Sequence, residues 1–129
     1  MRIVGHGIDI VALRTFMTLV NDPQSDFAVR CFTVEEMRLC EEELNRCVFL
    51  AGRYAAKEAV AKAMKTGFTR EVSPNEIEVG RDEKRAPTIE LRNSTAMVAR
   101  ALGITQWQIS ISHSVDAAIA SAIAISYDT

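Results

Sequence analysis

The middle of the chain carries a run of small and apolar residues whose spacing predicts a helix. The run is FLAGRYAAKEAVAKAMK, residues 49–65. At helical period its apolar members gather on one side, which we expect to face the core. They are Phe49, Ala56, Val60 and Ala63, with Leu50, Tyr54 and Ala61 beside them. The helix should end at Thr66-Gly67, because glycine readily takes the left-handed conformation that closes a helix.

Four charged residues interrupt this run. Glu58 and Lys62 lie one turn apart, opposite the apolar side, and Arg53 and Lys57 form a second charged strip. Taken alone, Glu58 and Lys62 would make an ordinary surface ion pair, which stabilises a helix by only about 0.3–0.5 kcal/mol. A chemical role for these charges therefore depends on partners from elsewhere in the chain.

Residues 2–11 alternate in the manner of a strand. The face that carries Asp9 also carries Ile3, Gly5, Gly7 and Val11, and the other face carries Val4, His6, Ile8 and Ile10. A carboxylate is uncommon in a strand, and glycines remove bulk beside it, so this face suits the approach of a ligand or of another backbone. In the alternative, Asp9 starts a turn or caps the next helix.

Capping residues, turn residues and alternation predict the other elements. In chain order they are a helix from Leu13 to the Asn21-Asp22-Pro23 cluster, a loop to about Arg30, a helix opened by a Thr33 and Glu36 capping box and running toward Glu43, strands at 77–79 and 88–91, a helix from an Asn93 or Ser94 cap to Gly103, and a strand at 107–112 that ends at His113.

Residues 117–125 form an almost unbroken apolar run. An antiparallel strand normally has one face in water, so a strand that is apolar on both faces should be covered twice. In a chain of 129 residues, a second subunit would supply the second cover.

Composition narrows the class of protein. The chain has 129 residues, 48% of them hydrophobic, which fits one domain over residues 1–129. Fifteen basic and seventeen acidic residues give a net charge of −2, which offers no argument for nucleic acid or an anionic membrane as partner.

The N-terminus lacks the pattern of a signal peptide and no apolar run approaches about 20 residues, so we expect a cytoplasmic protein. The three cysteines, Cys31, Cys40 and Cys47, lack CxxC spacing and should be reduced thiols.

The candidate chemistry combines two carboxylates with several cations. Asp9 and Glu58 are hard oxygen ligands of the kind magnesium prefers. The side chains that could neutralise phosphate are Arg53, Lys57, Lys62 and His113. The sequence has neither a GxxxxGK[ST] loop nor a GxGxxG turn, which argues against a P-loop or a Rossmann site. A Ser/His hydrolase built on Ser112, His113 and Ser114 is disfavoured because no nucleophile elbow is present.

Four segments together make the chain resemble a known family. They are GIDIV at 7–11, AGRYAAKEA at 51–59 followed by Lys62-Ala63, EIEV at 76–79, and SISHS at 110–114. In this order and at these separations they resemble the holo-[acyl-carrier-protein] synthases, the small bacterial type of 4′-phosphopantetheinyl transferase. The resemblance runs nearly from end to end.

The resemblance implies an α+β fold in which one long buried helix packs on an antiparallel sheet, and a homotrimer with active sites between subunits. It implies magnesium-dependent transfer of the phosphopantetheine group of coenzyme A to a serine of apo acyl carrier protein, in support of fatty acid biosynthesis. Adenosine 3′,5′-bisphosphate would leave.

The resemblance also implies roles for individual residues. Asp9 and Glu58 would hold magnesium at the coenzyme A pyrophosphate, which Lys62 would contact. Glu58 is the best candidate to remove the proton of the carrier serine. The residues expected around the nucleotide are Arg53, Lys57 and His113 at its phosphates and the 65–67 turn, with Gly67, near its adenosine.

The chain departs from the family in three places. Tyr54 stands where phenylalanine or tryptophan is usual, and Arg85-Ala86 replaces a common Gly-Lys or Gly-Ala pair. The first helix offers Arg14 and then no cation until Arg30, although relatives present several to the acidic carrier. This last departure leaves open a different class of function, a non-catalytic trimer that binds coenzyme A or a nucleotide.

Overall fold

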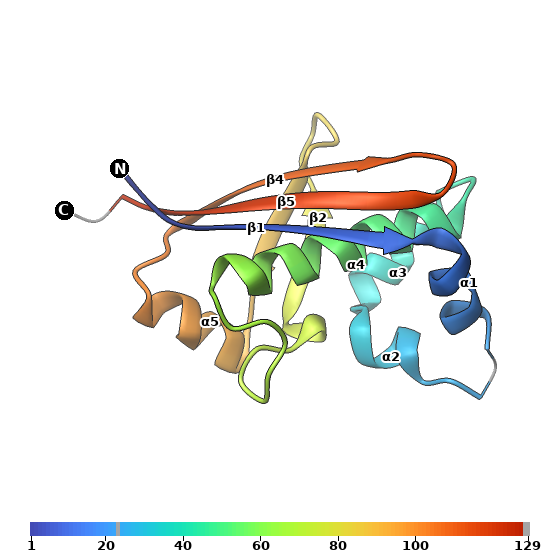
Figure 1. The fold of residues 1–129 in the computed structure, drawn as a ribbon, viewed down its shortest axis with the longest axis horizontal. Helices are drawn as coiled ribbons and strands as arrows, with labels where there is room; N and C mark the ends of the chain where they lie inside the picture. Colours follow the sequence, from blue (N-terminus) through green and yellow to red (C-terminus); the bar gives the residue numbers. More distant parts are fainter. Residues whose placement is uncertain (23, 128–129) are drawn as a thin grey trace.

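A three-stranded antiparallel sheet lies across one long helix in the computed structural model, which describes residues 1–22 and 24–127 (Figure 1). The elements are β1 Arg2–Ala12, α1 Leu13–Asn21, α2 Phe27–Cys31, α3 Val34–Cys40, α4 Arg46–Ala63, the 3₁₀ turn η1 Pro74–Glu76, β2 Ile77–Arg81, β3 Pro87–Leu91, α5 Asn93–Ala101, β4 Gln106–His113 and β5 Ala117–Ser126. Helices α2 and α5 lie on the other side of α4 from the sheet, whereas the β2–β3 hairpin runs past α4 and the sheet and its turn projects beyond β4 (Figure 1). Strand β3 contacts β4.

The sheet has the order β1-β5-β4, with β5 in the centre. The inner face of β5 carries only small side chains, and all of them are buried against α4. They are Ala118, Ala120, Ala122 and Ala124. The outer face of the sheet carries large apolar residues that stay exposed, namely Ile119 of β5 and Ile8 and Ile10 of β1, with Ile10 67% exposed. Strand β5 is therefore covered once, and residues 1–22 and 24–127 do not supply the second cover that its sequence predicts.

β1 approaches α4 backbone to backbone. A Cβ atom built on Gly7 would lie 1.9 Å from the Ala59 carbonyl oxygen, and one on Gly5 would lie 1.9 Å from the Ala63 carbonyl oxygen. The glycines thus make room for the backbone of α4. Of the two possibilities that the sequence left open, a ligand or another backbone, the structure shows the second. Asp9 remains inside the strand, opposite Ala120 of β5, so it neither starts a turn nor caps α1.

An irregularity in β1 changes the predicted alternation at its start. The register of β1 against β5 shifts between Ile3 and Gly5. Val4 therefore packs against the core and Ile3 is exposed, the reverse of the prediction. A strand bulge has this effect because one extra residue moves the following side chains to the other face.

The long helix begins three residues earlier than predicted. Asn45 caps it by accepting a hydrogen bond from the Val48 amide at 3.1 Å, and the helix ends at Ala63. In the turn that follows the helix, two residues adopt the left-handed backbone conformation, Lys65 with φ 66° and Gly67 with φ 64°. Gly67 takes the conformation that the sequence predicted, although it lies four residues beyond the end of the helix.

Two predictions about the shorter helices differ from the structure. The capping box of Thr33 and Glu36 is present as predicted. However, α2 occupies part of the expected loop, because five residues are too few to show a helical period. The cap of α5 is Arg92, not Asn93 or Ser94. The predicted stop at Pro23 lies outside the described residues.

The apolar side chains form two clusters along α4. One joins α4 to the sheet and the hairpin around Val60, Ile77 and Val79. The other joins it to the first three helices around Phe16 and Leu50.

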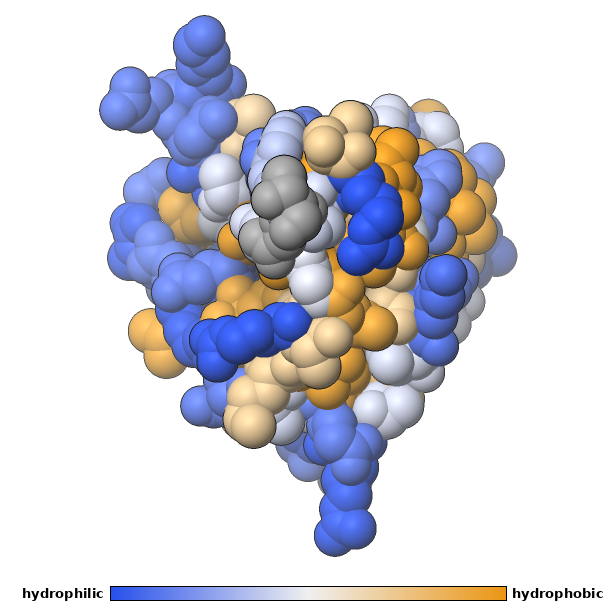
Figure 2. Space-filling model, turned by 90° about the vertical axis from the view of Figure 1, so that its left-hand side faces the viewer, coloured by the Kyte–Doolittle hydropathy of each residue, from blue (hydrophilic) through white to orange (hydrophobic). Residues whose placement is uncertain are grey.

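At the end of the molecule that carries both termini and α5, apolar surface shows between hydrophilic side chains (Figure 2). In residues 1–22 and 24–127, no helix has the length and hydropathy needed to cross a membrane.

We expect Gly7→Ala to destabilise the protein by about 3 kcal/mol, because the new methyl group would overlap the Ala59 carbonyl and force β1 away from α4. Denaturant unfolding of both proteins measures the change. Gly67→Ala is the control: it strains a left-handed residue but meets no atom within 4 Å, so it should cost only about 1 kcal/mol. Equal losses in the two variants would contradict the close contact of β1 and α4.

Candidate active site

One stripe of α4 reaches solvent. Between Phe49 and Met64 every residue is buried except Tyr54, Glu58 and Lys62. These three are spaced by four residues, so they lie on one face of the helix. Asp9 comes to the same place from β1.

The Lys62 ammonium group joins this stripe to β1. It donates to Asp9 Oδ1 at 2.9 Å and to the Ile8 carbonyl at 3.1 Å. The Lys62 side chain is 49% exposed and the Asp9 side chain 13%. The hydrogen bond to Asp9 raises the pKa of Lys62, so the ammonium stays charged at neutral pH. In the described part of the chain Lys62 forms its ion pair with Asp9 and none with Glu58, the partner that helical spacing alone favoured.

Tyr54 links Glu58 to the aromatic cluster. Its ring lies 5.7 Å from the Phe16 ring and 5.2 Å from the Phe27 ring, measured between centroids. Burial and then the hydrogen bond to Glu58 raise the pKa of the Tyr54 hydroxyl. The hydroxyl therefore keeps its proton beside the Glu58 carboxylate.

The donor set fits a hard divalent cation better than a transition metal. Asp9 and Glu58 both act electrostatically on Lys62 and Tyr54, so the two carboxylates share one region. Within the ranges that the structure describes, no three histidine, cysteine or acidic side chains are placed so that they could hold a metal ion together. Magnesium suits such a pair, because it takes few carboxylates and fills its shell with water and phosphate oxygens.

A second group of charges lines a cavity of about 540 Å³ beside the first half of α4. Arg53 and His113 line it together with Arg85 from the hairpin turn. The Arg53 side chain is nearly buried. Its guanidinium lies 4.2 Å from the centre of the Phe49 ring, and Nη2 donates to the Gly80 carbonyl at 3.3 Å.

Arg53 retains unused capacity to bind an anion. Its Nε atom is buried and has no hydrogen-bond partner among residues 1–22 and 24–127. Burial, and next the charge of Arg81, lower the pKa of the guanidinium, which means that an added negative charge would be favourable there. A buried donor of this kind is best satisfied by a ligand oxygen.

Sequence inspection missed the carboxylates of this cavity, Glu42 and Glu43, and noted Arg85 only as a departure from the family pattern. Arg81 donates to Glu42 at 3.0 Å and to Glu43 at 3.3 Å, and Arg85 lies 3.5 Å from the same Glu43 oxygen. The cavity lining thus carries two arginines, Arg53 and Arg85, and two carboxylates, Glu42 and Glu43. Arg81 lies outside the lining and pairs with both carboxylates. No local pattern marks this group, because the hairpin and the loop before α4 are about forty residues apart in sequence.

The two groups of charges lie on different flanks of α4. At about 100° per residue, Glu58 and Lys62 point about 140° and 180° away from Arg53. Of the predicted site residues, the structure brings together Asp9, Glu58 and Lys62, and separately Arg53 and His113. Gly67 follows the far end of α4, beyond Lys62.

Lys57 requires a correction. The sequence placed it near the nucleotide phosphates, but its side chain is fully buried. Its ammonium donates to Glu36 Oε1 and to the Pro74 carbonyl, each at 2.8 Å, and to the Ile77 carbonyl. An ammonium has three N–H donors, so none is left for a phosphate.

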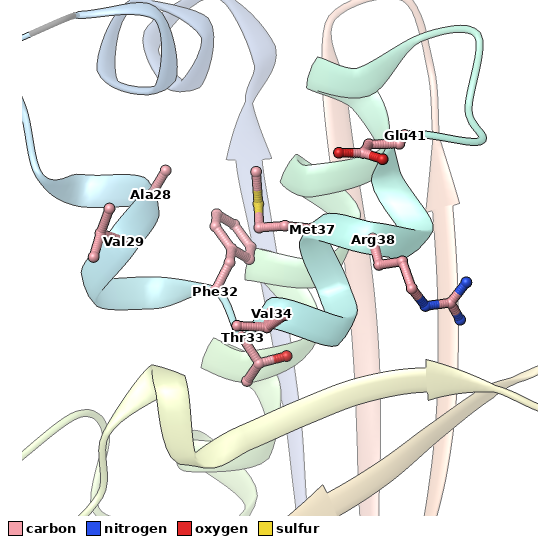
Figure 3. A pocket seen from close by; sticks show the side chains of 8 residues that line it. All are labelled: Ala28, Val29, Phe32, Thr33, Val34, Met37, Arg38 and Glu41. Atoms are coloured by element: carbon pink, nitrogen blue, oxygen red, sulfur yellow. The ribbon is translucent and has the colours of Figure 1, made fainter.

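Another cavity, of about 460 Å³, lies between α2 and α3 and offers no anion site. Its lining is mostly apolar and includes Phe32, Val34 and Met37. Arg38 is its one basic lining residue, and the guanidinium points away from the cavity (Figure 3). It binds Glu35 instead, at 2.6 and 2.8 Å.

The chain is similar in sequence to proteins of known family. Residues 5–122 match the sequence model of the 4′-phosphopantetheinyl transferase superfamily. The holo-[acyl-carrier-protein] synthase of Hydrogenovibrio crunogenus is 39% identical, over 95% of this chain and 96% of the relative. The corresponding protein of Beutenbergia cavernae is 42% identical, over 95% and 97%.

Solved structures agree with this similarity. The holo-[acyl-carrier-protein] synthase of Neisseria meningitidis superposes with a TM-score of 0.88 at 32% identity, covering 96% of this chain and 99% of that one. The Helicobacter pylori enzyme in complex with coenzyme A gives a TM-score of 0.82 at 30% identity, covering 93% and 99%.

Proposed function

The chain belongs to the 4′-phosphopantetheinyl transferase superfamily, in its holo-[acyl-carrier-protein] synthase group, and we propose that it moves the phosphopantetheine arm of coenzyme A onto a serine of apo acyl carrier protein. The observation that carries this proposal is the meeting of Asp9, Glu58 and Lys62 along the one stripe of α4 that reaches solvent. Such a group suits a pyrophosphate that must be both bound and cleaved.

In the proposed reaction the serine oxygen attacks the phosphorus that carries the pantetheine arm. The bond from that phosphorus to the bridging oxygen breaks, and adenosine 3′,5′-bisphosphate leaves with the bridging oxygen. The serine proton passes to Glu58, whose carboxylate has the protonated Tyr54 hydroxyl as its neighbour. The Lys62 ammonium is placed to neutralise the pyrophosphate, because half of its side chain faces solvent.

Asp9 and Glu58 are the residues that would hold magnesium. When bound, the cation would stabilise negative charge on the pyrophosphate oxygens. Asp9 already lies against Lys62 at 2.9 Å, so this lysine would balance the charge of the carboxylates before any ligand arrives.

The nucleotide end of coenzyme A is proposed to occupy the cavity of Arg53 and His113, with Gly67 near the adenosine. Because this cavity and the carboxylates lie on different flanks of α4, we propose that one active site takes the two groups from different subunits. The exposed isoleucines on the outer face of the sheet supply an apolar surface for this assembly, which we propose to be a homotrimer. A role in fatty acid biosynthesis would follow from modification of the carrier protein.

Incubation with coenzyme A, magnesium and apo acyl carrier protein should add the mass of one phosphopantetheine arm to the carrier. We expect Asp9→Asn and Glu58→Gln each to lower turnover at least about 10³-fold, because each removes a negative oxygen from the site. Glu83→Ala, in the exposed hairpin turn, is the control and should keep wild-type turnover. Coenzyme A binding without a mass gain on any carrier would favour the non-catalytic trimer instead.

Light scattering should show an assembly of three 14.3 kDa chains. Ile119→Asp should dissociate it, because a charge on the outer face of β5 cannot be buried cheaply. Val34→Asp, at a more exposed position on α3, should leave the assembly intact. A stable wild-type monomer at micromolar concentration would contradict the proposal.

Mixed assemblies test whether two subunits share a site. Glu58→Gln and His113→Ala disable different groups, so trimers co-expressed from both variants should regain part of the activity that each homotrimer lacks. Absence of any recovery in verified mixed trimers would place both groups in one subunit's site.

Arg14→Glu should raise the KM for an acidic carrier protein several-fold at low salt, because the exposed Arg14 is the only cation of α1. The effect should shrink as salt increases, and the KM for coenzyme A should stay nearly unchanged. A carrier KM that is unaffected at low salt would show that the carrier docks elsewhere.

A further inference from the structure

A buried ion pair connects α4, which lines the proposed nucleotide cavity, to the neighbouring elements α3 and β2. Lys57 of α4 and Glu36 of α3 are both fully buried, with Lys57 Nζ 2.8 Å from Glu36 Oε1. Two charges are costly to remove from water, and the pair persists only if the remaining donors and acceptors are also satisfied. The surroundings meet this condition in full.

The Lys57 ammonium holds the start of the hairpin. Besides Glu36, it donates to the Pro74 carbonyl of η1 and to the Ile77 carbonyl of β2. The ring of Phe32 lies 5.6 Å from Nζ. Burial lowers the pKa of Lys57, and the charge of Glu36 opposes this shift.

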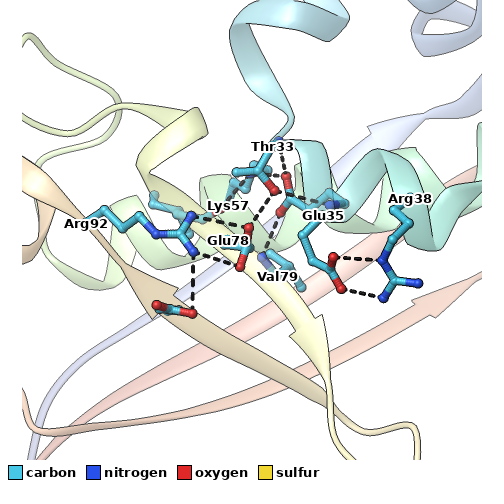
Figure 4. A network of polar contacts seen from close by, with 10 residues as sticks. Thr33, Glu35, Arg38, Lys57, Glu78, Val79 and Arg92 are labelled. Atoms are coloured by element: carbon cyan, nitrogen blue, oxygen red, sulfur yellow. Dashed lines mark hydrogen bonds and ion pairs between the residues drawn. The ribbon is translucent and has the colours of Figure 1, made fainter.

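The Glu36 carboxylate holds the next part of the same strand. Its Oε2 accepts a hydrogen bond from the Val79 amide at 2.7 Å, and its Oε1 accepts one from the Thr33 amide at 2.9 Å. The network continues outward, because the Thr33 hydroxyl lies 2.7 Å from Glu78, which Arg92 also binds (Figure 4). One carboxylate thus closes the capping box of α3 and binds β2.

These bonds are made along β2, and the hairpin residues that follow β2 line the cavity. Three side chains bind successive parts of β2. Lys57 donates to the Ile77 carbonyl, Glu36 accepts from the Val79 amide, and Arg53 donates to the Gly80 carbonyl. Arg81 follows, with its ion pairs to the loop before α4. The hairpin then turns and presents Arg85 and Pro87 to the cavity. The distance between α4 and this strand therefore decides how far Arg85 and the hairpin stand from Arg53.

We propose that Glu36 and Lys57 are positioning residues, which hold β2 against α4 and so set the width of the cavity that contains Arg53 and His113. Neither touches the ligand. The inference rests on the proposed function only in taking coenzyme A as the ligand of that cavity.

This inference and a direct contact of Lys57 with phosphate predict different responses to Glu36→Gln. If Lys57 bound phosphate, removal of the competing carboxylate would free the ammonium, and coenzyme A would bind equally well or better. If the pair positions the hairpin, the variant loosens the cavity and coenzyme A binds less well.

Steady-state kinetics of the full-length enzyme separate these outcomes. For Glu36→Gln we expect the KM for coenzyme A to rise about tenfold, with kcat within about twofold of wild type, because the Asp9 and Glu58 flank is untouched. A merely less stable protein would instead lose kcat and keep its KM. Glu35→Gln is the matched control: Glu35 is the preceding residue, partly exposed and paired with Arg38, so its KM should not change.

Hydrogen exchange and NMR keep the test decisive if Glu36→Gln folds poorly. In wild-type protein labelled with ¹⁵N-lysine, the ammonium signal of Lys57 should be protected and should not shift when coenzyme A is added. In any folded fraction of Glu36→Gln, the Val79 amide should exchange faster than in Glu35→Gln. A shift of the Lys57 signal with coenzyme A, or an unchanged or lower KM in Glu36→Gln, would overturn the inference. A wild-type enzyme that modifies no carrier would contradict the proposed function. The NMR and exchange results would still test the positioning role of Glu36 and Lys57.

Discussion

The contact between the backbones of β1 and α4 is the constraint on which the remaining structure depends. Gly5 and Gly7 leave no room for a side chain, so the strand rests directly on the carbonyl groups of the helix. The alanines of β5 allow the sheet to continue at the same short distance. As a result Asp9, two residues beyond Gly7, meets Lys62 at 2.9 Å. The small residues thus bring a strand carboxylate to a helix ammonium.

The helix uses its charges in two distinct ways. Tyr54, Glu58 and Lys62 face solvent and remain available to a ligand. Arg53 and Lys57 are directed into the protein, where they bind carbonyl groups of β2. A charge in the interior is costly unless its donors have partners. All three donors of Lys57 have partners, whereas Arg53 Nε has none among residues 1–22 and 24–127. This difference separates a structural cation from one that is prepared for an anion.

The arrangement of a single chain is incomplete in two related respects. The outer face of the sheet exposes isoleucines of β1 and β5, and the two charged groups face different flanks of α4. The proposed assembly accounts for both features. A second subunit that covers the sheet of the first would also bring the cavity of the second subunit toward the carboxylates of the first. Burial of apolar surface and completion of the proposed site would then be one event.

Sequence alone determined what depends on local spacing and on ordered motifs. Helical period identified the buried face of α4, the capping box located α3, and the GIDIV and KEA segments singled out Asp9 and Glu58. Only the tertiary structure decided which charge meets which partner. Lys62 pairs with Asp9 rather than with Glu58, and Lys57 is withdrawn from the surface by Glu36 and the Ile77 carbonyl. Period and capping act through neighbours along the chain, whereas ion pairs and burial depend on groups that only folding brings together, so no local pattern encodes them.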